Sequence, residues 1–165
     1  MIPLPVSIDD DILDFARRAP FPARSKLIPS SPRHLMDASS SPGFDCGFIA
    51  AAAQIAWGCL YEAHELVQRH EGHPDADYLH ALIHRFEGDA GNHRWWLRQV
   101  GRHPLHARLE AELRQIQNLP PEWTPLVKRW DGLAAANLDL GPSGVALRRY
   151  EWCLLCQKLR ASQSL

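Results

Sequence analysis

The sequence has neither a large excess of charge of one sign nor a long apolar run. Its 165 residues carry 18 Lys and Arg against 19 Asp and Glu, a formal net charge of -1, so the chain as a whole is not attracted to nucleic acid or to an anionic membrane. The longest apolar run, from Phe48 to Leu60, is interrupted by Gln54 and is too short to span a bilayer. We therefore expect no membrane partner and do not favour nucleic acid.

An export signal and a disulfide framework are missing as well. The opening MIPLPVSIDDDILDF has no basic stretch followed by an apolar one, the pattern of a secretion signal. The four cysteines are Cys46, Cys59, Cys153 and Cys156, and without an export signal we expect reduced thiols in a cytoplasmic protein. The single Cys-x-x-Cys lies in a helical pattern without a second pair, so core packing is favoured over zinc or redox chemistry.

Strand-like alternation of apolar and polar residues is also lacking, whereas apolar residues recur at helical spacing. A hydrophobic content of 45% and a length of 165 residues fit one domain with a real core. We predict an all-α fold, a single-domain bundle of about six or seven helices over 1–165. The Pro/Ser-rich stretch 20–43 is expected to be extended, because prolines disrupt regular helix.

Helix ends are indicated by glycine, proline and acidic capping residues. The central helix should run over about 45–70, with small alanines that permit close packing. Pro74 at a first helical position and Gly88 after the last predict a helix over 74–87, and Asp89 can cap the next. The expected helices are about 8–16, 45–70, 74–87, 89–100, 104–116, 126–136 and 145–161.

The histidines form the most informative pattern, since eight of the nine lie between His64 and His106. His80 and His84 are four residues apart, so both imidazoles can face one ion, and Glu87 lies on the same helix face. His64, at the edge of the central apolar stripe, could complete the set. Two or three imidazoles with a carboxylate suit a divalent transition metal, and zinc, iron and manganese remain open.

A simpler interpretation competes with the metal site. The apolar residues of the same helix, among them Leu79 and Phe86, lie opposite the face that carries Asp77, His80 and His84. Such a face is usually turned to solvent on an amphipathic helix. Asp77 is then explained by the helix dipole alone.

Several neighbouring side chains are candidates for binding a small ligand. Trp95 cannot share the buried face of its helix with Trp96, so it could floor a pocket or pack at an edge. Arg85 could bind a phosphate or carboxylate, or pair with a nearby acid. The candidate ligand-binding residues are Arg85, Asp89, Asn92, Trp95 and His103.

The run Tyr78-x-His80-Ala81-x-x-His84-Arg85-x-Glu87-Gly88-Asp89-x-x-Asn92-x-x-Trp95-Trp96, continued by Val100-Gly101-x-His103-Pro104, resembles a family of uncharacterised bacterial and fungal proteins. The resemblance extends upstream to Leu60-x-x-x-His64 and also includes Glu151-Trp152 near the C-terminus. It groups these positions but implies no activity. The chain departs from the pattern at His93, where alanine is expected, and at Trp95, where tyrosine is expected. The histidine pair is intact.

The same run is similar to a tetratricopeptide or Sel1-type helical hairpin, although only one such unit is visible and repeat folds need about three. Two functions remain open at this point. The first is a metal- or small-ligand-binding helical protein, which could be hydrolytic. The second is a protein-interaction module without chemistry, and binding of nucleic acid through the arginines is the least favoured.

Overall fold

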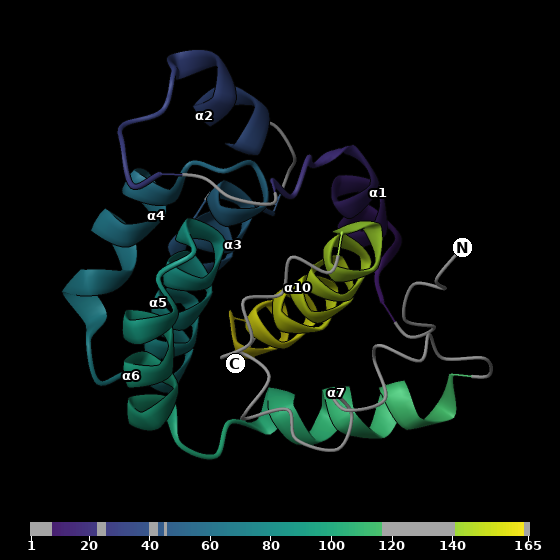
Figure 1. Cartoon of the computed structure of the whole chain (residues 1–165). Helices are drawn as coiled ribbons and strands as arrows, with labels where there is room; N and C mark the ends of the chain where they lie inside the picture. Colours follow the sequence, from purple (N-terminus) through teal and green to yellow (C-terminus); the bar gives the residue numbers. More distant parts are fainter. Residues whose placement is uncertain (1–7, 23–25, 40–42, 45, 117–140, 164–165) are drawn as a thin grey trace.

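The part of the chain that the computed structural model describes comprises 8–22, 26–39, 43–44, 46–116 and 141–163. It is helical throughout, with no strand in these ranges, so the predicted all-α, single-domain fold is confirmed (Figure 1). The helices are α1 (Asp10–Arg18), α2 (Pro32–Ser39), α3 (Gly47–Ala56), α4 (Leu60–Val67) with the 3₁₀ turn η1 (Gln68–His70), α5 (Pro74–Glu87), α6 (Ala90–Val100), α7 (Pro104–Gln115) and α10 (Gly141–Gln163). These described ranges alone hold eight α-helices, more than the six or seven predicted.

The predicted central helix over 45–70 is wrong, because it is two helices. Gly58 has a φ of 79°, a left-handed conformation that ends a helix and suits glycine. The backbone N–H of Cys59 donates to the carbonyl of Gln54 at 2.8 Å, and α4 begins at Leu60 in a new direction. The break places His64 of α4 against α5.

The expectation of an extended segment over 20–43 is partly wrong, because α2 lies within it. Pro32 is the first residue of α2, where a missing N–H costs nothing. No proline follows it until after the helix has ended. The backbone N–H of Leu35 donates to the carbonyl of Ser31, which starts the helical ladder.

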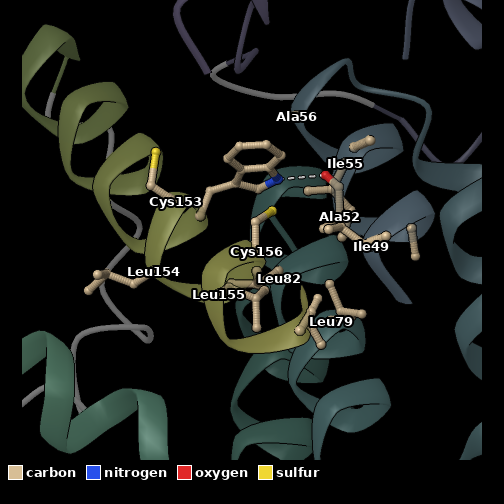
Figure 2. Packing of buried hydrophobic residues seen from close by; sticks show 14 of the residues in the cluster. Ile49, Ala52, Ile55, Ala56, Leu79, Leu82, Cys153, Leu154, Leu155 and Cys156 are labelled. Atoms are coloured by element: carbon tan, nitrogen blue, oxygen red, sulfur yellow. Dashed lines mark hydrogen bonds between the residues drawn. The ribbon is translucent and has the colours of Figure 1, made fainter. Parts of the chain in front are cut away.

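The last helix, α10, is the centre of the core. Its Trp152 is 2% exposed and donates from Nε1 to the carbonyl oxygen of Ala52 on α3 at 2.6 Å (Figure 2). Phe15 of α1 and Phe44 stack on the same indole. The alanines of α3 allow the two backbones to come this close, as the sequence suggests. α10 begins at Gly141, earlier than the predicted 145.

Some of the remaining expectations concern residues that the structure does not describe, and the others can be compared with it. The predicted helix over 126–136 lies outside the described residues. α7 begins at Pro104 as predicted, and no described helix has both the length and the apolar character needed to cross a membrane. No disulfide forms among the cysteines: Cys59, Cys153 and Cys156 are buried free thiols, and Cys46 is exposed.

The α5–α6 hairpin has the predicted ends. α5 starts at Pro74 and ends at Gly88, which has a φ of 86°. The Asp89 side chain then accepts a hydrogen bond from the backbone N–H of Asn92 at 2.9 Å and caps α6. Hydrogen bonds from this backbone N–H and from the Asn92 side chain lower the pKa of Asp89, although the small burial opposes them. The turn therefore fixes α6 beside α5.

Replacing Asp89 by alanine is expected to lower the free energy of unfolding by about 1 kcal/mol, because α6 loses its N-cap. Asp89→Asn keeps a capping oxygen and should retain most of the stability. Chemical unfolding followed by circular dichroism measures both. If both variants lose metal or ligand while keeping stability, Asp89 has a binding role instead of a capping one.

Candidate functional site

The face of α5 that carries Asp77, His80 and His84 is buried, so its interpretation as a solvent-facing stripe is wrong. The three residues are 4%, 0% and 8% exposed. α5 contacts α3, α4 and α6, and α4 and α6 cover the face that a simple amphipathic helix would leave open (Figure 1). The histidine pair therefore faces protein.

Three imidazoles meet in this interface. The ring centroids of His64 and His80 are 4.8 Å apart, those of His64 and His84 are 5.9 Å apart, and those of His80 and His84 are 6.3 Å apart. The structure thus brings together the three histidines that the sequence nominated, one from α4 and two from α5. We call His64, His80 and His84 the histidine cluster.

His80 is the unusual member of the cluster. It is fully buried, and both its ring nitrogens lack a hydrogen-bond partner among the described residues. One face of its ring is covered by the indole of Trp96, at 4.0 Å between centroids and 12° between planes. Buried polar atoms are nearly always hydrogen-bonded, so the fold itself does not account for His80.

The cluster is electrically neutral at its centre. Burial, with the neighbouring His64 and His84, lowers the pKa of His80 from 6.5 to about 3. Burial and His84 also lower the pKa of His64, although the carboxylates of Glu65, Glu87 and Glu71 oppose the shift. At neutral pH both rings are uncharged and each offers a nitrogen lone pair.

Glu87 lies beside the cluster and orients it. Its Oε2 is 3.3 Å from Nδ1 of His84, and because an ionised carboxylate can only accept, this contact favours a proton on Nδ1. Carboxylates hold metal-binding histidines in this way. Glu87 therefore suits a supporting role better than the direct ligation that the sequence suggested.

The arrangement falls short of a formed metal centre. Within the described residues, no three His, Cys, Asp or Glu side chains are placed so that they could hold a metal ion together. The rings make edge and stacked contacts. The three rings lie close together without forming such a group.

Arg85, a predicted ligand-binding residue, is occupied within the fold. It forms an ion pair with Glu151 of α10, and the hydroxyl of Tyr78 donates to the other oxygen of that carboxylate. Glu151 is 1% exposed. This buried set ties α5 to α10, so Arg85 holds the scaffold together beside the histidine cluster.

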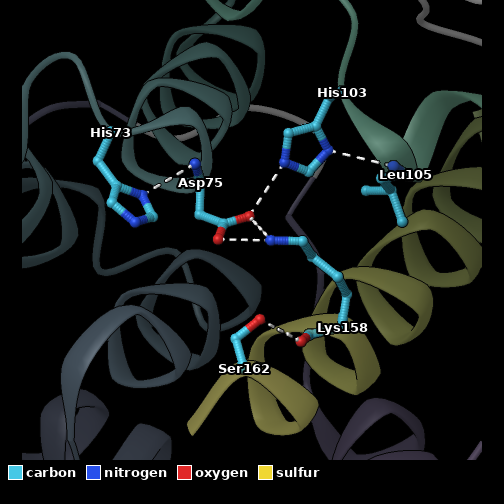
Figure 3. A network of polar contacts seen from close by, with 6 residues as sticks. All are labelled: His73, Asp75, His103, Leu105, Lys158 and Ser162. Atoms are coloured by element: carbon cyan, nitrogen blue, oxygen red, sulfur yellow. Dashed lines mark hydrogen bonds and ion pairs between the residues drawn. The ribbon is translucent and has the colours of Figure 1, made fainter. Parts of the chain in front are cut away.

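His103 is occupied in the same manner (Figure 3). Its Nδ1 accepts the backbone N–H of Leu105 and caps α7, and its Nε2 donates to Asp75 at 3.0 Å. Lys158 of α10 pairs with the same carboxylate. Burial raises the pKa of Asp75, but the hydrogen bonds from His103 and Lys158 outweigh it and leave the pKa lowered.

Of the other predicted ligand-binding residues, two are used in a helix cap and one lies at the surface. Asn92 binds the capping Asp89 through both its backbone and its side chain. Trp95 is 46% exposed and packs edge-on against Trp96, so it lies at the surface next to the cluster. Of the nominated residues, the histidine cluster, Glu87 and Trp95 are those that the scaffold does not otherwise use.

Sequence reasoning did not pair Glu151 with Arg85 or Lys158 with Asp75, although the family resemblance reaches Glu151, and it missed Trp96 as the ring that covers His80. Glu151 and Lys158 are 66 and 83 residues away from Arg85 and Asp75, and no local pattern connects positions so far apart. For Trp96 the sequence did contain a signal, because helical spacing placed this residue on the buried face of its helix. Comparisons of the chain with known protein families, curated proteins and solved structures find no match.

Proposed function

We propose that the protein binds one divalent transition-metal ion through His64, His80 and His84, with Glu87 orienting His84. The observation that carries the proposal is His80, a fully buried imidazole beside two further histidines, whose two nitrogens have no hydrogen-bond partner among the described residues. A metal ion is the ligand that satisfies several neutral imidazoles at once.

The separation of the rings supports this proposal. Two imidazoles bound to one zinc ion at about 2.1 Å in tetrahedral geometry have centroids about 5 Å apart. The cluster has separations of 4.8, 5.9 and 6.3 Å. Metal binding then needs rotation of the side chains. Turning His80 breaks no hydrogen bond to the described residues, although it gives up the stacking on Trp96, and His64 is only partly buried.

Charge supports the same conclusion. Glu65, Glu71 and Glu87 act electrostatically on His64, so the cluster has carboxylates near it that favour a cation. Three nitrogen ligands favour zinc over manganese, which prefers oxygen. Three protein ligands also leave a fourth position for water, which zinc makes a usable nucleophile near neutral pH.

The test is metal analysis of the full chain, purified without a tag or chelator. We expect close to one zinc per chain after reconstitution, and loss of that zinc in a His80→Ala/His84→Ala double variant. The matched control is His34→Ala, which changes an exposed histidine of α2 outside the cluster. Circular dichroism must show that the double variant is still folded.

A second readout removes the dependence on that variant. Cobalt binding should produce visible absorption bands and quench the fluorescence of Trp96, whose indole stacks on His80. Trp96→Phe should remove most of the quenching and leave the absorption bands. Absence of bound metal in the wild-type protein, or equal metal in the folded double variant, would overturn the proposal. In that case Trp95, exposed next to the cluster, becomes the starting point for a protein-interaction role.

A further inference from the structure

A second feature lies where the first turn of α7 meets the last turns of α10. A cavity of about 400 Å³ opens between the two helices, a volume within the range of small-molecule sites. It shares no residue with the histidine cluster. The residues that line it are Pro104, Leu105, Arg108, Gln157, Lys158 and Ala161.

The two charged residues in this lining are both cations, and none of the described lining residues is acidic. Arg108 uses Nε to bind Glu112 at 2.9 Å, and its Nη groups have no hydrogen-bond partner among the described residues. Lys158 donates to both carboxylate oxygens of Asp75, so one of its three N–H donors has no partner among the described residues. The cavity therefore presents unused positive donors from two helices.

The acids that pair with these cations are committed elsewhere. Glu112 also accepts the hydroxyl of Tyr150 at 3.0 Å through its second oxygen. Asp75 also accepts from His103 and is 5% exposed. The carboxylates hold Arg108 and Lys158 in place, and an oxyanion in the cavity would bind their remaining donors. The first turn of α7 adds a favourable potential for negative charge.

We propose that this cavity binds a small organic oxyanion, a carboxylate or a phosphate monoester, between Arg108 and Lys158. The apolar part of the ligand would pack on Pro104, Leu105 and Ala161. Leu105 is buried and gives a fixed floor. The proposal is independent of the metal site, so either can fail without the other.

The experiment is a titration of the full chain with benzoate and with phenyl phosphate in a low-salt buffer. Binding is measured by calorimetry and by changes in NMR chemical shifts. We expect saturable binding of at least one of them. Arg108→Glu should weaken it by about tenfold or more, since it removes charged hydrogen-bond donors and places a negative charge beside the oxyanion. The preference between the two ligands identifies the oxyanion.

The matched control is Arg114→Glu. Arg114 lies on the same helix, makes the same i,i+4 contact with an acid, and is outside the cavity. A second variant, Ala161→Phe, fills the cavity from an exposed position without a change of charge, and should also abolish binding. No saturable binding to the wild-type protein, or equal weakening by Arg108→Glu and Arg114→Glu, would overturn the proposal.

Discussion

Glu151→Gln is expected to lower the free energy of unfolding by about 3–5 kcal/mol, because it leaves the charge of Arg85 buried without a counter-charge. Glu151 is 1% exposed, the side chain of Arg85 is 10% exposed, and the two are in direct contact. The same carboxylate accepts the hydroxyl of Tyr78. Urea unfolding at pH 7.5 measures the loss.

Simultaneous removal of both charges distinguishes a buried ion pair from a packing defect. Arg85→Met combined with Glu151→Leu replaces the pair by apolar groups of similar size, and should recover most of the stability. Arg17→Ala is the control, since its pair with Asp14 is largely exposed and should change stability by no more than about 1 kcal/mol. A small loss in Glu151→Gln would show that Arg85 is free to bind a ligand.

The double variant also shows whether Arg85 has a structural role or a ligand-binding role. If Arg85 serves the fold, the double apolar variant keeps metal binding at the histidine cluster. If Arg85 binds a ligand of that cluster, the double variant folds but loses the ligand. The local sequence motif cannot make this distinction, because Arg85 and His84 are adjacent within it.

Much of the fold could be predicted because its helix ends depend on local chemistry. Pro74, Gly88 and Asp89 determine the ends of α5 and α6 through backbone conformation and capping, and these effects act within a few residues. The break at Gly58 was missed because glycine inside an apolar helical pattern is ambiguous. Only the packing of α4 on α5 requires it to be a break.

The site was only half predictable for a different reason. Helical spacing placed His80 and His84 on one face correctly, but it also led to the expectation that this face is exposed. That expectation assumes one buried side per helix, whereas α5 contacts α3, α4 and α6. A helix surrounded by others buries its polar residues too, and their partners are then distant ones such as Glu151.

Acidification is expected to destabilise the protein well above the pH at which carboxylates titrate. Burial lowers the pKa of both His80 and His93 to about 3, against about 6.5 in the unfolded chain. Below pH 6.5 the unfolded state therefore binds more protons than the folded state. The stability is complete above pH 6.5 and is lost as the pH falls toward 3.

The expected loss is a large fraction of the stability of the protein. Each of the two histidines costs about 1.4 kcal/mol per pH unit below 6.5, or about 2 kcal/mol at pH 5. Together they remove about 4 kcal/mol, a large part of the roughly 5–15 kcal/mol that stabilises a typical domain. Urea unfolding between pH 5 and 7.5, in the presence of EDTA, measures the slope.

The pH range in which stability is lost assigns this loss to histidines and not to carboxylates. Asp75 has a lowered pKa, so its contribution is present above 3.9 and is lost only as the pH falls through its folded pKa. His80→Leu should lower the slope between pH 5 and 6.5 without abolishing it, because His93 and His64 also have a lowered pKa, and His34→Ala, at an exposed position, should leave it unchanged. A stability that is flat from pH 7.5 to 5 would mean that protonated His80 is accommodated in the fold. Added zinc should steepen the slope, because a metal bound to neutral imidazoles competes with protons for the same nitrogens.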